Sequence, residues 1–124
     1  MLEVKSLTFT HEGQNQICFP DISLSNNEGL IVLGNSGSGK TTLINLIAGL
    51  IKPDSGDITL NQTKYNELSL DDLDIFRGKN IGLIFQKPHF IRNLNVLENL
   101  SLSTHLSRNK VRREIFCLLY TSPS

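Results

Sequence analysis

A glycine-rich loop between a wholly apolar segment and an amphipathic one is the feature that most constrains how this chain can fold. Residues 30–33 (LIVL) show no polar alternation, which predicts a central strand covered on both faces. After the loop, apolar residues at positions 43, 46, 47, 50 and 51 share one face of a helix, which Gly49 and Pro53 should end. A buried strand that leads through a tight loop into a helix predicts an α/β fold with a largely parallel core sheet.

The rest of the chain adds strands and helices to this plan. Apolar residues alternate over residues 2–9 with a slip near Ser6, which predicts a strand interrupted by a bulge. Further strands are expected over residues 17–24, 57–60 and 81–85, the last of them wholly apolar. Helices are expected over residues 69–77, with Gly78 as the stop, and from residue 95 onward.

The loop itself carries the chemistry. Residues 34–41 read GNSGSGKT and match the pattern G-x-x-x-x-G-K-[ST] between a strand and a helix. Glycines let the backbone wrap tightly around a polyphosphate, and the helix N-terminus adds a positive dipole end. Lys40 would face the β- and γ-phosphates, and the Thr41 hydroxyl would ligate Mg²⁺. We therefore predict a nucleoside triphosphate site; the alternative is a Gly/Ser-rich turn that binds nothing.

The residues around this loop select among the classes of protein that share it. Residues 34–43 (GNSGSGKTTL), 46–50 (LIAGL) and 53–58 (PDSGDI) are followed by residues 77–86 (RGKNIGLIFQ) and 93–100 (NLNVLENL). Together they resemble the nucleotide-binding subunit of ABC transporters over about residues 1–105. Within that family they look closest to the lipoprotein-releasing and macrolide-export type.

The resemblance implies a fold, cofactors and site residues. The fold is a P-loop NTPase of the ABC ATPase type, here the N-terminal part, with a short β subdomain, a parallel-sheet core and the start of a helical subdomain. The implied ligands are ATP and Mg²⁺, with Thr41 and Gln86 at the metal. The residues implied to bind the nucleotide are Gly34, Asn35, Ser36, Gly37, Ser38, Gly39, Lys40, Thr41, Thr42, His11 and Gln86.

Two of these assignments, those of His11 and Gln86, have an alternative interpretation. His11 occupies the place where the family usually has a tyrosine that stacks on adenine; the alternative is an exposed loop histidine. Gln86 follows an apolar segment and would complete the Mg²⁺ shell or contact the attacking water, while its loop would sense the membrane subunit. Its alternative is an ordinary polar residue on a surface loop.

The family's remaining catalytic motifs do not occur in this sequence. It holds no LSGGQ-like signature loop, no later strand ending in Asp-Glu and no switch histidine. We therefore expect this chain to bind ATP without hydrolysing it efficiently, and we expect a fragment. Residues 1–92 would be an incomplete core, residues 93–116 the start of the helical subdomain, and residues 117–124 a non-native tail. That tail resembles a translated sequencing adapter; the alternative is a natural, poorly ordered C-terminus.

The implied partners are transmembrane permease subunits and a second nucleotide-binding subunit in a head-to-tail dimer, at the cytoplasmic face of the cell membrane. The alternatives are a soluble ABC-type ATPase of DNA repair or translation, a small P-loop kinase, and a fragment that does not fold stably. The basic cluster at positions 108, 110, 112 and 113 is interpreted as a solvated helix face, so no nucleic acid is expected. Two cysteines are too few for a disulfide framework, which favours a reducing compartment and makes the sequons at Asn61 and Asn99 chance matches.

Overall fold

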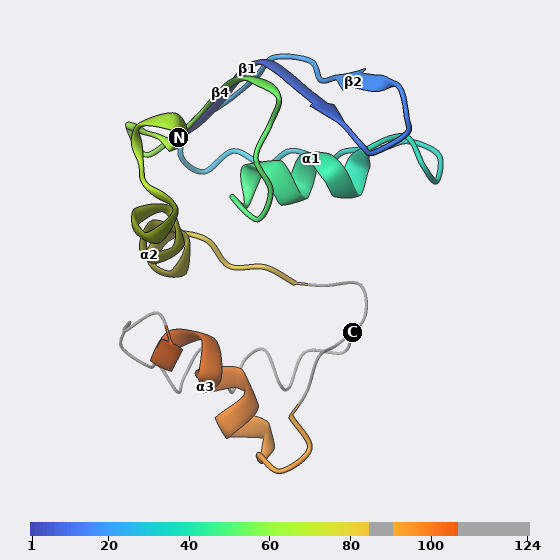
Figure 1. The fold of residues 1–124 in the computed structure, drawn as a ribbon. Coiled ribbons are helices and arrows are strands. Elements are labelled where there is room, and N and C mark those ends of the chain that lie inside the picture. The colour runs from blue at the N-terminus through green and yellow to red at the C-terminus, as the bar shows by residue number, and fades with distance from the viewer. Residues whose placement is uncertain (85–90, 107–124) are drawn as a thin grey trace. The chain divides into compact units, whose positions relative to one another are not determined.

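The structure, a computed structural model, describes residues 1–84 and 91–106, with side chains up to residue 102. The chain divides into two compact units, Met1–Leu73 and Asp74–Ser124, and each is described by itself. In chain order the elements are β1 (Leu2–Thr10), β2 (Gln16–Cys18), β3 (Ile22–Leu24), α1 (Lys40–Ile47), β4 (Ser55–Leu60), β5 (Thr63–Lys64), the 3₁₀ turn η1 (Tyr65–Glu67), α2 (Leu70–Asn80) and α3 (Val96–Leu106) (Figure 1).

The first unit is built on one antiparallel sheet in which β1 is central. β2 and β3 pair with successive parts of one edge of β1, and β4 pairs with the other edge and with β5. The alternation predicted over residues 2–9 is therefore confirmed, because one face of β1 is buried and the other is exposed.

The slip predicted near Ser6 is also confirmed, as a β-bulge. Between Lys5 and Thr8 the register with β4 shifts, and Ser6 adopts a left-handed φ of 51°. Because of this extra residue, Val4 and Leu7 both point into the core and are 0% exposed, although they are three positions apart. The bulge presses against Gly56 on β4, where a Cβ atom would lie 2.5 Å from the Ser6 carbonyl oxygen.

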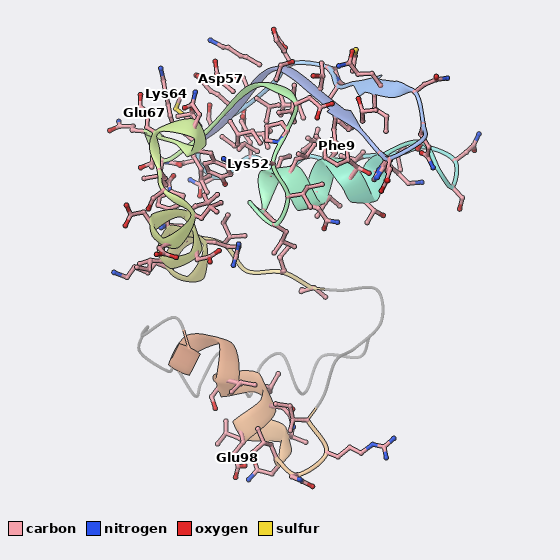
Figure 2. The ribbon with its side chains drawn as sticks, in the orientation of Figure 1. Phe9, Lys52, Asp57, Lys64, Glu67 and Glu98 are labelled. Atoms are coloured by element: carbon pink, nitrogen blue, oxygen red, sulfur yellow. The ribbon has the colours of Figure 1, made fainter. Side chains whose placement is uncertain are left out.

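α1 covers the buried face of the sheet, as Figure 1 shows. Leu43 and Leu46 of this helix join Val4, Leu7 and Ile58 in the core, and Phe9 packs against that cluster between β1 and α1 (Figure 2). The helix ends as predicted: Ala48 is its C-cap, and Gly49, with φ 73°, donates its N–H to the Leu46 carbonyl at 3.0 Å.

The strand expected over residues 17–24 is wrong in one respect, because the chain forms two short strands there. β2 ends at Cys18 and β3 begins at Ile22, with Pro20 between them. Proline has no N–H to donate to a sheet, so the pairing with β1 stops and resumes beyond it. Asp21 then turns back and accepts a hydrogen bond from the Ser6 N–H at 2.8 Å, which satisfies a backbone group of the bulge.

The two wholly apolar segments do not form the strands that their sequences predict. Residues 30–33 and 81–84 are extended without a ladder to any described residue, and Ile31, Leu33 and Ile84 are 83%, 87% and 97% exposed. Such strands need neighbours on both edges and cover on both faces, and the described residues supply neither. The sheet that is described is accordingly antiparallel rather than parallel, and Phe85 lies outside the described residues.

Both later helices begin with a side-chain cap, and the one at Ser69 was expected. The Ser69 hydroxyl accepts a hydrogen bond from the Asp72 N–H at 3.1 Å, and α2 continues through Gly78 to Asn80, three residues beyond the predicted end. At α3 the Asn95 and Glu98 side chains form a reciprocal cap. Asn99 also holds the preceding loop, since its amide group bonds the backbone of Ile91 in both directions.

Candidate nucleotide-binding site

The glycine-rich loop leads directly into the first turn of α1. Gly39 is the N-cap residue of the helix, with φ 97°, and Gly37 has φ 81°. Both values lie in the left-handed region that a side chain would strain. Within the loop, the Ser38 N–H donates to the Asn35 carbonyl at 3.1 Å and closes a turn. The two glycines therefore provide the tight wrapping that their spacing predicts.

The start of α1 offers backbone donors. Leu43 is the first residue whose N–H reaches a helix carbonyl, that of Gly39 at 2.9 Å. The N–H groups of Lys40, Thr41 and Thr42 come earlier in the helix and have no acceptor within it. Because α1 is also positive at this end, the first turn suits an anion.

Lys40 supplies the side-chain cation of the loop. Its Nζ donates to the Gly34 carbonyl oxygen, so the side chain lies back along the loop. The space around Gly34 is tight, because a Cβ atom there would lie 2.6 Å from Ser38 Oγ. A phosphate oxygen can replace the carbonyl as the acceptor for Lys40.

His11 lies beside the same turn of α1. Its Nε2 is 2.8 Å from the Thr42 Oγ1, and its ring meets the Phe9 ring edge-on, with centroids 4.9 Å apart. Thr42 is only 7% exposed. The sequence reading placed both residues at the site but did not foresee the bond, because they are 31 positions apart and no local pattern relates them.

Of the remaining predicted ligands, Thr41, Asn35 and Ser36 lie among the described residues and Gln86 does not. Thr41 is exposed at the first turn of α1, beside the loop. Gln86 lies outside the described residues, so the prediction for it stays a prediction. Thr41 offers a hydroxyl oxygen, which suits a hard cation that is also held by phosphate oxygens. Asn35 and Ser36 are exposed in the loop.

The described residues of the first unit line an open groove and a smaller pocket, and neither of these contains the His11–Thr42 pair. An open groove of about 490 Å³ runs from Ser38, Gly39 and Lys40 along residues 30–34, with apolar walls. A second pocket of about 290 Å³ lies at the other end of α1, between Gly49, Tyr65 and Leu73. There the Tyr65 hydroxyl donates to the Ile47 carbonyl at 2.6 Å, and burial raises the pKa of Tyr65 to about 12.

Comparison with known sequences identifies the class of protein that this loop and fold define. Residues 20–120 match the sequence model of the family described as ABC transporter. The chain therefore belongs to the ABC transporter family. The resemblance drawn from the residues around the loop is confirmed.

Individual relatives agree with this assignment. The chain is 35% identical over 116 residues to the lipoprotein-releasing system ATP-binding protein LolD of Wigglesworthia glossinidia brevipalpis, covering 90% of this chain and 51% of that protein. It is 40% identical over 111 residues to the ABC transporter ATP-binding protein YxdL of Bacillus subtilis, covering 87% of this chain and 43% of that protein. The chain thus spans about half the length of these curated relatives.

Solved structures agree on the fold. The ATP-binding cassette MJ0796, in a dimeric post-hydrolysis state bound to ADP and Pi, superposes with a TM-score of 0.77 at 31% identity, covering 94% of this chain and 52% of that one. The fold is that of the N-terminal part of an ABC ATPase, as the sequence predicts. Of the helices that the structure describes, none has the length and apolar character needed to span a membrane.

Proposed function

We propose that this chain binds Mg²⁺–ATP through residues 34–42 and forms the nucleotide-binding part of an ABC transporter ATPase subunit. The observation that carries the proposal is the left-handed Gly37–Gly39 loop, which leads into the first turn of α1, where N–H groups lack a helix acceptor and the Lys40 ammonium reaches back along the loop. Family membership and the ADP-bound cassette MJ0796 support it.

Each residue has a part in holding the nucleotide. The first-turn N–H groups and Lys40 bind phosphate oxygens, and Lys40 leaves the Gly34 carbonyl to do so. Thr41 and Gln86 would hold Mg²⁺, which on binding neutralises phosphate charge. We propose that the base or ribose approaches the loop beside His11, whose ring lies next to the first turn of α1. In the complete protein, we propose that ATP hydrolysis uses motifs beyond these residues.

The transport role is the finer part of the proposal. LolD is named as part of a lipoprotein-releasing system, and this supports lipoprotein release or efflux as the work that ATP drives. The partners would be membrane permease subunits and a second copy of the ATPase, since MJ0796 is dimeric. The chain would then sit peripherally on the cytoplasmic side of a membrane. Reconstitution of the complete protein with candidate permeases, assayed with lipoprotein and with an efflux drug, distinguishes the two types.

The nucleotide site is tested by removing the Lys40 cation. We expect Lys40→Ala to weaken Mg²⁺–ATP binding about 10- to 100-fold, because a charged hydrogen-bond donor to phosphate is lost. Isothermal titration calorimetry on the chain measures this. Lys52→Ala is the matched control, since Lys52 is an exposed lysine beyond the other end of α1. Equal affinities for Lys40→Ala and the unmodified chain would contradict the proposed site.

A further inference from the structure

The contact between His11 and Thr42 joins the sheet to the first turn of α1. His11 follows the last residue of β1, and its Nε2 lies 2.8 Å from Thr42 Oγ1. Thr42 is the one buried polar residue in the part of the chain that the structure describes. The imidazole plane is set by Phe9, which meets it at 82° and itself packs against the core (Figure 2). The ring is therefore oriented by Phe9 on one side and by the Thr42 hydroxyl on the other.

We propose that His11 is a positioning residue for the phosphate-binding turn: it sets whether the Thr42 hydroxyl hydrogen points at the imidazole or is available to a phosphate oxygen. The proposal rests on the proposed function, because it concerns the same loop. It assigns His11 a role toward the phosphates, which is separate from stacking on a base.

The chemistry follows from the two arrangements that one hydrogen bond can have. When Nε2 carries no hydrogen, it accepts from the Thr42 O–H, and that hydrogen is used. When Nε2 carries a hydrogen, it donates to Oγ1, and the hydroxyl hydrogen is free to donate elsewhere. A neutral ring can hold its hydrogen on either nitrogen, whereas a protonated ring always donates from Nε2. Protonation therefore removes the arrangement in which Nε2 takes up the Thr42 hydrogen, and it adds a positive charge beside the phosphate turn.

The elements next to His11 carry few charged groups that could alter the charge on its imidazole. α1 contributes Lys40 alone, and β2 contributes none. The turn after β1 contributes Glu12, and the segment before β4 contributes Asp54, whose N–H bonds the Thr8 carbonyl. Among the described residues none of these forms an ion pair with His11. The imidazole is in direct contact with Thr42, and a positive charge on it would favour a bound polyphosphate.

The experiment compares ATP with inorganic tripolyphosphate, which has no base to stack on. Affinities are measured by calorimetry at about pH 6 and about pH 8, because histidine is the side chain that gains a proton between about pH 8 and pH 5. We expect the unmodified chain to exceed His11→Gln in tripolyphosphate affinity about three- to tenfold more at the lower pH, since a charge-assisted contact is gained there. Protonation of the phosphate affects both proteins equally, so this ratio isolates His11.

Matched variants keep the result interpretable. Thr42→Val should remove the pH-dependent ratio and Thr42→Ser should retain it, because only serine keeps the hydroxyl. His105→Gln removes an imidazole from α3 and should behave as the unmodified chain. If His11→Gln unfolds, judged by circular dichroism, His11→Phe preserves the ring and serves in its place.

The outcomes separate this proposal from the one on which it rests. A ratio that is the same at both pH values, or an effect of His11 on ATP but not on tripolyphosphate, would overturn the positioning role. If the unmodified chain and Lys40→Ala bind tripolyphosphate equally, the loop is not a phosphate site and both proposals fail. Loss of the pH dependence in His11→Gln and Thr42→Val, with binding retained, is the expected result.

Discussion

The alternating strands and the wholly apolar segments of this chain differ in how far their apolar side chains are exposed to solvent. On β1 and α1, Val4, Leu7 and Leu46 are 0% exposed, whereas Leu33 and Ile84 in the apolar segments are 87% and 97% exposed. An alternating strand needs cover on one face only, and α1 provides that cover although it lies about 30 residues or more away along the chain. A strand that is apolar on both faces needs two layers and two edge neighbours. Hydrophobicity alone therefore does not bury a segment, because burial also needs neighbouring elements that cover it.

The largest loss of stability is expected when a core side chain between α1 and the sheet is shortened. We expect Leu46→Ala to lower the free energy of unfolding by about 2–5 kcal/mol, because it leaves a cavity beneath β1. Leu33→Ala is the matched control, and its cost should stay within about 0.5 kcal/mol, since that side chain contacts little. Urea unfolding of the chain measures both. Similar losses for the two variants would break the distinction between the regions.

A smaller effect is expected at the bulge that sustains the buried face of β1. Gly56→Ala should cost about 1–3 kcal/mol, because position 56 has a φ of 96° and the added Cβ would meet the Ser6 carbonyl at 2.5 Å. Gly29→Ala serves as the control, since a Cβ there meets nothing within 4 Å. Thermal unfolding followed by circular dichroism compares them. A neutral Gly56→Ala would show that the bulge can relax at no cost.

The smallest effect concerns Tyr65, which borders the pocket at the far end of α1. Removing its hydroxyl in Tyr65→Phe should cost about 1 kcal/mol at neutral pH, through loss of the bond to the Ile47 carbonyl.

Tyr65 also makes the free energy of unfolding depend on pH, and the sign of this dependence follows from its pKa. Burial raises the pKa of folded Tyr65 from 10.0 to about 12, so the unfolded chain ionises first. The free energy of unfolding should therefore fall as pH rises from 10 toward 12, and Tyr65→Phe should lack this part of the fall. Urea unfolding at several alkaline pH values measures the difference. An identical decline in both proteins would contradict the role of burial.

Much of the fold was predictable where the physics is local. The bulge at Ser6, the helix that follows the loop and its end at Gly49 were all legible in the spacing of apolar residues and glycines. The split between β2 and β3 was missed although Pro20 signals it. The hydrogen bonds of Asn99 to the Ile91 backbone span 8 positions, and the sequence showed only a chance sequon there.

The sequence by itself determined the glycine-rich loop before α1 and the family, because glycine spacing and helix phase depend on neighbours within a few residues. Only the tertiary structure decided that His11 meets Thr42, and that residues 30–33 stand exposed beside the loop. Both outcomes depend on how β1 is registered against α1 and on which strands are at hand to pair. Such long-range geometry is set by packing, and no local pattern of residues encodes it.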